Sequence, residues 1–171
     1  ARTRWQSPDV EIITANVTCT SSLRRELESG VDLATATYIL VQEHRLDAAA
    51  IDSASSWALN AGWRLLGDEA YFKVKALGGG TAVMSRSVGA ARPAPGAKSL
   101  MRGRLSFVVA DLCGDVLIGS AYGVSGGTCA QQLPLWKAIA VYVRTLGLPF
   151  IIGADWQCTP SDLEESGLPA L

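Results

Sequence analysis

The sequence Ile39-Leu40-Val41-Gln42-Glu43-His44-Arg45 places a short apolar run directly before a carboxylate. The run covers Tyr38–Gln42, and its length and composition are typical of a buried strand that is closed by Glu43. A second run of this kind, Leu148–Ile152, leads into Gly153-Ala154-Asp155. In α/β folds, ligands bind in the crevice at the carboxyl ends of the strands. The two carboxylates are therefore expected to meet at one edge of a sheet.

A third strand end carries an amide side chain. Val10–Ala15 is a β-rich apolar run that ends at Asn16. Mg²⁺ prefers oxygen ligands and typically takes one or two protein carboxylates beside a substrate phosphate. Taken singly, a polar residue at a strand end is more typical of a loop or a helix cap. The combination of Asn16 with Glu43 and Asp155 predicts a site for a divalent metal ion or a phosphate group.

Helical and strand patterns alternate along the rest of the chain. Helices are predicted over Leu23–Leu27, between Ile51 and Leu59, and after the capping-box pair Thr128 and Gln131. Strands are predicted over Trp63–Leu66, Thr81–Ser85, Leu105–Leu112 and Val116–Ala121, the last two forming a hairpin. The segment Val88–Ser99, rich in Ala, Pro and Gly, is expected to be a loop. This order of elements predicts an α/β protein with a mixed sheet packed against helices.

Composition restricts the class of protein. The 171 residues are 49% hydrophobic and 18% charged, which suits one α/β domain with a sizeable core. No stretch approaches the ~20 apolar residues of a membrane span, and no apolar run follows Arg2 and Arg4 to form a secretory signal. The glycines at 78–80 lack the lysine of a phosphate-binding loop, so no nucleotide cofactor is expected. The four cysteines lack the spacing of a zinc site and are expected to be reduced and structural, as in an intracellular protein.

The basic residues are unevenly distributed. A formal net charge of −1 argues against non-specific coating of nucleic acid. No acidic residue occurs between Glu69 and Asp111, whereas basic residues are frequent there: Lys73, Lys75, Arg86, Arg92, Lys98, Arg102 and Arg104. This segment is expected either to face phosphate groups or to form a solvated surface whose charges are balanced by acidic neighbours in space.

Five short motifs occur in a characteristic order. They are Ile13-Thr14-Ala15-Asn16-Val17, Ile39-Leu40-Val41-Gln42-Glu43-His44-Arg45, Gly79-Gly80-Thr81-Ala82-Val83, Arg102-Gly103-Arg104-Leu105 and Ile151-Ile152-Gly153-Ala154-Asp155-Trp156-Gln157. Together they resemble the endonuclease/exonuclease/phosphatase superfamily, particularly the apurinic endonuclease-like domains of LINE-type retroelements. The resemblance implies a four-layer α/β sandwich of two mixed β-sheets flanked by helices. Residues 1–171 are expected to form a single domain that is missing its C-terminal part, since the superfamily's closing Ser-Asp-His triplet is not found.

The resemblance also implies roles for the residues at the strand ends. Asn16 would hold a phosphate or a metal-bound water, and Glu43 would be the principal ligand of Mg²⁺, for which Mn²⁺ could substitute. Tyr122 would contact the scissile phosphate. Asp155 would face the metal and position or deprotonate the attacking water. Gln157 stands where the superfamily has an asparagine that steadies the transition state.

Three residues near these positions carry further expectations. Gln157 is one methylene longer than asparagine, which moves its amide by more than ~1 Å and is expected to slow the reaction. His44 cannot replace the missing histidine, because along a strand it points away from Glu43, and it is expected at the surface or behind the site. Trp156 is expected to pack beneath the site and to hold Asp155 and Gln157 in place.

The resemblance implies a Mg²⁺-dependent DNA endonuclease, with Arg86, Arg102 and Arg104 as nucleic-acid contacts. A retroelement protein of this kind would act in the nucleus. Two alternatives stay open. A degenerate domain would bind nucleic acid or a protein without catalysis, as Gln157 and the missing histidine suggest. A phosphatase or phosphodiesterase of the same superfamily would act on inositol phosphates or lipids.

Overall fold

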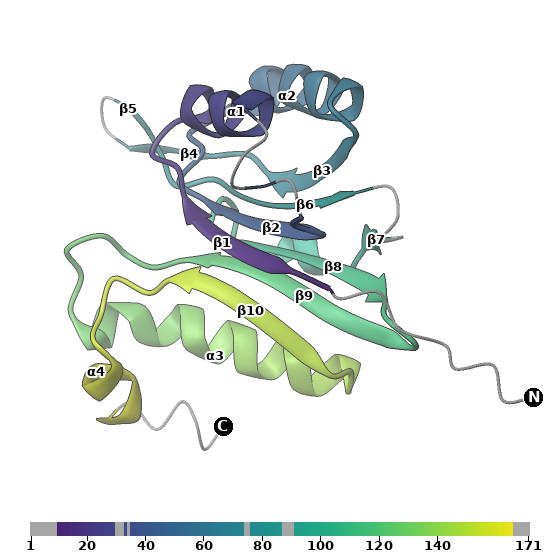
Figure 1. Ribbon diagram of the computed structural model, residues 1–171. Coiled ribbons are helices and arrows are strands. Elements are labelled where there is room, and N and C mark those ends of the chain that lie inside the picture. Colours follow the sequence, from purple (N-terminus) through teal and green to yellow (C-terminus); the bar gives the residue numbers. More distant parts are fainter. Residues whose placement is uncertain (1–9, 30–32, 34, 74–75, 87–90, 166–171) are drawn as a thin grey trace, which may run out of the picture.

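The computed structural model describes residues 10–29, 33, 35–73, 76–86 and 91–165. Figure 1 shows four layers, which are a pair of helices, a β-sheet, a second β-sheet and one long helix. Both sheets are mixed, because each contains parallel and antiparallel pairs. The expected four-layer α/β sandwich is confirmed. Within the described ranges, no helix combines the length and the apolar character that crossing a membrane requires.

The first sheet has the strand order β1-β2-β6-β3. Its strands are β1 (Ile12–Asn16), β2 (Tyr38–Gln42), β6 (Thr81–Arg86) and β3 (Trp63–Asp68). The strand β1 runs parallel to β2, and β6 is antiparallel to both β2 and β3. The outer face is covered by the helices α1 (Thr20–Ser29) and α2 (Ala48–Asn60), as Figure 1 shows.

The second sheet has the strand order β10-β9-β8-β7. Its strands are β10 (Phe150–Asp155), β9 (Asp115–Tyr122), β8 (Leu105–Asp111) and β7 (Ala91–Pro93). The predicted hairpin is β8–β9, and β10 is parallel to β9. The long helix α3 (Cys129–Leu146) covers the outer face, and its start is closed by the predicted capping box of Thr128 and Gln131.

Three apolar clusters hold the four layers together. Ile39 of β2 belongs to the cluster beneath α1 and α2, whereas its neighbour Leu40 belongs to the cluster between the sheets. In the same way, Leu117 of β9 faces α3, and Ile118 faces the first sheet. Successive residues of a strand point to opposite faces, so a strand at the centre of a sandwich is apolar at every position. This burial explains the continuous apolar run in β2.

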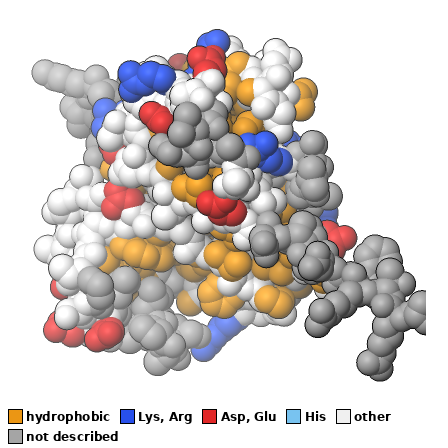
Figure 2. All heavy atoms as spheres, in the orientation of Figure 1, with side chains coloured by type: hydrophobic (Ala, Val, Ile, Leu, Met, Phe, Trp, Pro, Cys, Tyr) orange, Lys and Arg blue, Asp and Glu red, His pale blue; other side chains and the backbone are white. Residues whose placement is uncertain are grey.

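The strands β1 and β10 end their sheets on the same side of the sandwich, where Figure 1 shows both in front. Each pairs with one neighbour only among the described strands. Phe150 and Ile151 of β10 are 56% and 44% exposed. Figure 2 shows hydrophobic side chains gathered over the lower half of this face. This side of the molecule therefore presents open strand edges beside an apolar surface.

Several short elements were not predicted from the sequence. They are the hairpin of β4 (Tyr71–Lys73) and β5 (Ala76–Gly78), and the helix α4 (Pro160–Glu165). The expectation of a loop over 88–99 is wrong in part, because Ala91–Pro93 forms β7 and Ala97–Ser99 forms the 3₁₀ helix η1. Residues 88–90 lie outside the described residues. Pro93 is tolerated because β7 lies at the edge of its sheet.

No disulfide joins the four cysteines, all of which the structure describes. Cys19, Cys113 and Cys129 are exposed, so the expectation that the cysteines are structural is wrong for these three. The hydroxyls of Ser21 and Ser22 lower the pKa of the Cys19 thiol to about 7. Exposed positions offer no apolar contacts to a thiol, and sequence spacing alone carries no signal of exposure.

Candidate active site

The predicted residues at the strand ends converge at one end of the sandwich. Parallel pairing aligns Asn16 of β1 with Gln42 of β2, and Asp155 of β10 with Tyr122 of β9. Asn16 Nδ2 donates a hydrogen bond of 2.5 Å to Asp155 Oδ2. This bond joins the edge strand of one sheet to the edge strand of the other, so the two sheets contribute to a single site.

Close approach of the two sheets makes this bond geometrically feasible. A Cβ atom on Gly153 of β10 would lie 2.6 Å from Leu40 Cδ1 and 3.0 Å from Thr14 Cβ. Neither distance leaves room for a side chain, so glycine is the residue that lets β10 lie against β1 and β2. The glycine in the motif before Asp155 therefore sets the separation of the strand ends.

Asp155 is held by amide groups on both of its oxygens. Its Oδ2 accepts from Asn16 and also from Gln157 Nε2 at 2.5 Å, and its Oδ1 accepts a longer bond of 3.3 Å from the backbone N–H of Gln157. The long side chain of Gln157 thus folds back onto Asp155. Trp156 packs against the cluster beneath α3.

Glu43 follows β2 and forms an ion pair with Arg45, through Oε1 and Nη2. The Glu43 side chain is 15% exposed, whereas that of Arg45 is 49% exposed. Burial raises the pKa of the Tyr122 phenol, and the nearby Glu43, Tyr71 and Asp155 raise it further. The influence of both carboxylates on one phenol places Glu43, Asp155 and Tyr122 around the same space. Tyr122 therefore stays protonated at neutral pH and can donate a hydrogen bond.

His44 anchors the backbone that carries Glu43. Its side chain is 3% exposed, so the part of the expectation that placed it at the surface is wrong, and it lies behind the site. The backbone N–H of Leu46 donates to Nδ1 at 3.1 Å, which assigns the ring proton to Nε2, and Nε2 donates to Thr81 O at 3.3 Å. Burial lowers the pKa of His44. A Cβ on Gly80 would lie 2.5 Å from the His44 ring, so this glycine makes room for the imidazole.

Backbone strain is concentrated at the site. Positive φ angles occur at four non-glycine residues in the loops after β1, β2 and β10: Thr18 (50°), Glu43 (60°), Arg45 (55°) and Gln157 (54°). Side-chain-bearing residues rarely adopt this conformation, and it persists only where the surrounding structure enforces it. Two of these residues, Glu43 and Gln157, carry side chains of the predicted site.

Buried polar side chains join the sheets directly below the site. Gln42 Nε2 donates to Ser120 Oγ at 2.9 Å, and Ser120 Oγ donates to Val41 O at 2.7 Å. A second bridge runs from Ser106 Oγ to Thr81 O at 2.7 Å. Because hydrogen bonds are directional and apolar contacts are not, these bridges set the register between the sheets.

Comparison with known proteins identifies the fold. No family model matches the sequence, and no curated protein matches it either. Among solved structures, an AP endonuclease from Leishmania major is 18% identical, with a TM-score of 0.61 over 85% of this chain and 54% of its own. A 3′ phosphatase from Neisseria bound to a product DNA hairpin is 17% identical, with a TM-score of 0.63 over 89% of this chain and 59% of its own.

A third solved structure, an endonuclease/exonuclease/phosphatase family protein from Bacteroides thetaiotaomicron, is 14% identical, with a TM-score of 0.54 over 86% of this chain and 63% of its own. The chain has the endonuclease/exonuclease/phosphatase fold. The resemblance seen in the sequence motifs is therefore confirmed at the level of the fold. The chain spans less than two thirds of the length of each of these three proteins.

Within the endonuclease/exonuclease/phosphatase fold of this chain, the oxygen-rich edge suits a hard cation. No group of three or more His, Cys, Asp or Glu side chains is placed to hold a metal ion among the described residues. Mg²⁺ does not require such a group, because it keeps several waters and uses one or two carboxylates. Glu43 and Asp155 would hold the ion, and Asn16 supplies a further oxygen at the same edge.

The structure separates the three arginines expected to contact nucleic acid. Arg102 is exposed and forms an ion pair with Glu69, so it stays a candidate. Arg104 is half-buried and donates to Tyr122 O, Gly123 O and the Tyr71 hydroxyl. Arg86 is at the end of β6 that lies away from Glu43, since β6 is antiparallel to β2. The three do not form one surface, so the basic stretch in the sequence is not a basic stripe in space.

The donors of Arg86 are used inside the protein. Its Nε donates to Ala36 O at 2.8 Å and its Nη2 donates to Leu33 O at 2.9 Å, while the guanidinium lies 4.7 Å from the centre of the Trp63 ring. Of the remaining basic residues in the stretch, Lys75 and the side chain of Lys73 lie outside the described residues.

Tyr71 and Arg45 belong to the site although sequence reasoning missed both. Tyr71 begins the unpredicted strand β4, and it reaches Tyr122 only through the tertiary fold. Arg45 offered a local signal, because it follows Glu43 by two residues, but a left-handed backbone at both positions is needed for them to pair.

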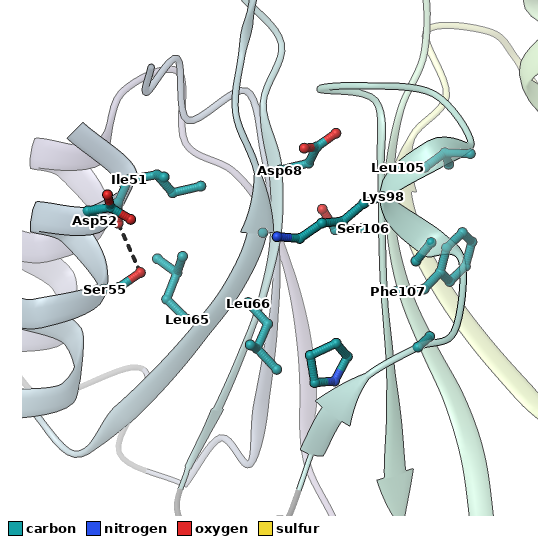
Figure 3. A pocket seen from close by; sticks show the side chains of 14 residues that line it. Ile51, Asp52, Ser55, Leu65, Leu66, Asp68, Lys98, Leu105, Ser106 and Phe107 are labelled. Atoms are coloured by element: carbon teal, nitrogen blue, oxygen red, sulfur yellow. Dashed lines mark hydrogen bonds between the residues drawn. The ribbon is translucent and has the colours of Figure 1, made fainter. Parts of the chain in front are cut away.

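A separate cavity of about 270 Å³ lies on the side of the sandwich opposite β1 and β10. Residues of α2 and β3 line it from the first sheet, and residues of η1 and β8 line it from the second. Figure 3 shows Leu65, Leu66 and Phe107 in its walls, with Asp68 and Lys98 near them. None of the residues predicted for the site lines it.

Proposed function

We propose that this chain hydrolyses phosphodiester bonds in DNA with the help of Mg²⁺, as an endonuclease of the apurinic or retroelement type. The observation that carries the proposal is the hydrogen bond between Asn16 and Asp155, which brings the ends of both sheets together beside Glu43 and Tyr122. The site then combines two carboxylates for a metal, one of which also serves the nucleophile, and a neutral phenol for a phosphate oxygen.

Each side chain has a definite chemical task in this proposal. A bound Mg²⁺ would offset the charge that develops on the phosphoryl oxygens. Asp155 Oδ1 accepts only a long hydrogen bond, so it has capacity left to orient a water molecule and to take its proton. Tyr122 keeps its proton and donates to a phosphate oxygen. Asn16 holds Asp155 in place through its amide.

Arg45 would compete with the cation for Glu43. The Glu43 carboxylate is paired with the Arg45 guanidinium through Oε1, and this positive charge repels a second cation at the same carboxylate. Arg45 is half-exposed and flexible enough to swing outward, where it would lie at the rim of the site. It would then be available to a phosphate of the substrate backbone, a geometry in which arginine is effective.

Support for DNA as the substrate comes from two observations. The similar 3′ phosphatase from Neisseria was solved with a product DNA hairpin. In this chain, Arg102 is exposed, and it forms an ion pair with Glu69 at the surface. Such an ion pair contributes little to stability, so the guanidinium can exchange Glu69 for a phosphate group of DNA. An enzyme of the retroelement type would act on chromosomal DNA and therefore in the nucleus.

The decisive experiment is a plasmid-nicking assay with the purified protein. We expect conversion of supercoiled to open-circular DNA with Mg²⁺ or Mn²⁺, faster cleavage at abasic sites, and no cleavage in EDTA. Glu43→Gln keeps the size of the side chain and removes its charge, so it should abolish cleavage. Glu28→Gln on the exposed side of α1 is the matched control and should leave cleavage unchanged. Cleavage that survives Glu43→Gln contradicts the proposal.

One observation favours a second function, a domain that binds nucleic acid without cleaving it. The Gln157 amide is turned back onto Asp155, where its side-chain N–H groups are used within the protein. This alternative predicts DNA affinity that is indifferent to Mg²⁺ and falls steeply with salt, because counterion release drives such binding. Tight binding with no cleavage at any metal concentration would establish it.

A further inference from the structure

The Arg104 side chain lies between two tyrosine rings at the edge of the site. Its guanidinium carbon is 4.7 Å from the centre of the Tyr71 ring and 5.8 Å from that of Tyr122. Nη1 donates to Gly123 O at 2.6 Å and to Tyr122 O at 3.2 Å, and Nη2 donates to the Tyr71 hydroxyl at 2.6 Å. Planar stacking and several hydrogen bonds from one rigid fork are properties of arginine that lysine does not share.

The same residue also holds the end of β9 through its backbone. The N–H of Tyr122 donates to Arg104 O at 2.9 Å. Arg104 therefore contacts Tyr122 at three points, which are its backbone N–H, its carbonyl oxygen and its ring. Tyr122 is the last residue of β9, where the chain leaves the sheet. The end of β9 is also held by β10, because the N–H of Gly123 donates to Asp155 O at 2.8 Å, and Arg104 adds contacts to the carbonyl and the ring of Tyr122.

Tyr71 connects this contact to the loop that carries Glu43. A Cβ on Gly79 would lie 2.5 Å from Tyr71 Cε1, and a Cβ on Gly103 would lie 3.0 Å from Tyr71 Cδ1, so the ring lies close against two glycines. Gly79 O in turn accepts the N–H of Arg45 at 3.0 Å. A continuous set of contacts therefore runs from the Tyr122 strand end, through Arg104 and Tyr71, to the Glu43 loop.

We propose that Arg104 is a positioning residue, which orients the Tyr122 phenol relative to Glu43 by clamping Tyr122 against Tyr71, and that it does not bind the substrate phosphate. The inference rests on the proposed function for the identity of the reaction. It differs from the expectation drawn from the basic stretch of sequence, in which Arg104 contacts nucleic acid. The neighbouring exposed Arg102 keeps that role.

The test compares Arg104→Lys with Arg144→Lys, a matched control on the exposed side of α3. Lysine keeps the positive charge and binds phosphate as a point charge, but it cannot stack and bond as a planar fork. We expect Arg104→Lys to lower kcat for nicking of abasic DNA by about 100-fold, the loss typical of a ~1 Å misplacement, with KM unchanged. Arg144→Lys should leave kcat unchanged. An Arg104→Lys variant with the kcat of the unaltered protein would overturn the inference, because a phosphate contact tolerates lysine.

A second measurement does not depend on catalysis. With ¹³C-labelled tyrosine rings, Arg104→Lys should shift the resonances of Tyr71 and Tyr122 and speed the flipping of both rings, whereas Arg144→Lys should not. Tyr71→Phe keeps the ring and removes the hydroxyl acceptor, so it should shift Tyr122 in the same direction and report on the clamp if Arg104→Lys folds poorly. Unmoved Tyr122 resonances in both variants would overturn the inference.

The salt dependence of DNA binding separates the remaining explanations. Arg104→Gln should leave the slope of log affinity against log salt unchanged, whereas loss of a phosphate contact would reduce it by about one ion. A reduced slope overturns the inference. If the protein cleaves no DNA, the proposed function fails while the tyrosine resonances still decide whether Arg104 clamps Tyr122.

Discussion

Removal of the Ser120 hydroxyl tests whether the buried bridges set the register of the two sheets. Ser120 is fully buried, and Ser120→Ala removes one oxygen atom without a large cavity. The substitution deletes the bond from Gln42 Nε2 and the bond to Val41 O. Each bond contributes about 1 kcal/mol net, and a buried group left unpaired adds to the loss, so the free energy of unfolding should fall by about 2–3 kcal/mol.

Urea denaturation followed by tryptophan fluorescence measures this change. With a slope of about 2 kcal/mol per M, the midpoint should fall by about 1–1.5 M. Ser56→Ala is the matched control, because Ser56 lies on the exposed side of α2 and alanine favours helix formation, so stability should be unchanged or slightly higher. A loss below about 0.5 kcal/mol for Ser120→Ala, the range of ordinary surface substitutions, would refute the reasoning.

A double substitution sharpens the same test. Gln42→Leu with Ser120→Ala replaces both side-chain partners by apolar groups, but Gln42 also donates to Leu40 O and accepts from Thr14 Oγ1, so stability should not recover relative to Ser120→Ala alone. Nicking activity should not recover, since Gln42 precedes Glu43 and its bridge holds the strand end against β9. Recovery of activity together with stability would show that apolar packing alone sets the register.

Three further predictions concern the site itself. Arg45→Ala should tighten Mn²⁺ binding to the Glu43 carboxylate, measured by calorimetry, and unchanged affinity would show that the ion pair does not compete with the metal. Burial lowers the pKa of His44, so as the pH falls the imidazole is protonated in the unfolded chain before it is protonated in the folded one. Thermal stability should therefore fall as the pH drops below about 6.5. His44→Gln should remove this dependence of stability on pH between about pH 7 and 5. Gln157→Asn suits the left-handed backbone at this position and frees Asp155 Oδ2 from its side-chain donor, so the nicking rate should rise about tenfold or more, and an unchanged rate would show that the longer amide does not slow the reaction.

The strongest local patterns predicted their elements well. The strand Tyr38–Gln42 has the predicted bounds, and the helix after Thr128 begins with the predicted capping box. Both signals depend on residues that are close together in the sequence, so the two elements can be predicted without knowing what the rest of the chain does. The short strands β4 and β5 carried no such signal, because a three-residue strand is stabilised by what it pairs with.

Charge patterns were the least reliable guide. The stretch from Lys73 to Arg104 is free of acidic residues in sequence, yet Arg86, Arg102 and Arg104 have three different environments. Their acceptors are backbone carbonyls, a surface carboxylate and a tyrosine hydroxyl. A count of charges along a segment carries no information about acceptors that distant segments supply.

The sequence alone determines which residue types stand at the strand ends, because a buried strand must be apolar and the first polar residue marks its end. Asn16, Glu43 and Asp155 can therefore be selected from the order of residues in the chain. That Asn16 binds Asp155, that Arg45 covers Glu43, and that Arg104 faces inward instead of outward depend on how two sheets and a small hairpin pack. The physical reason is the distance along the sequence over which each feature is decided. Strand burial is encoded by adjacent residues, whereas hydrogen-bond partners are supplied by segments that only the fold brings together.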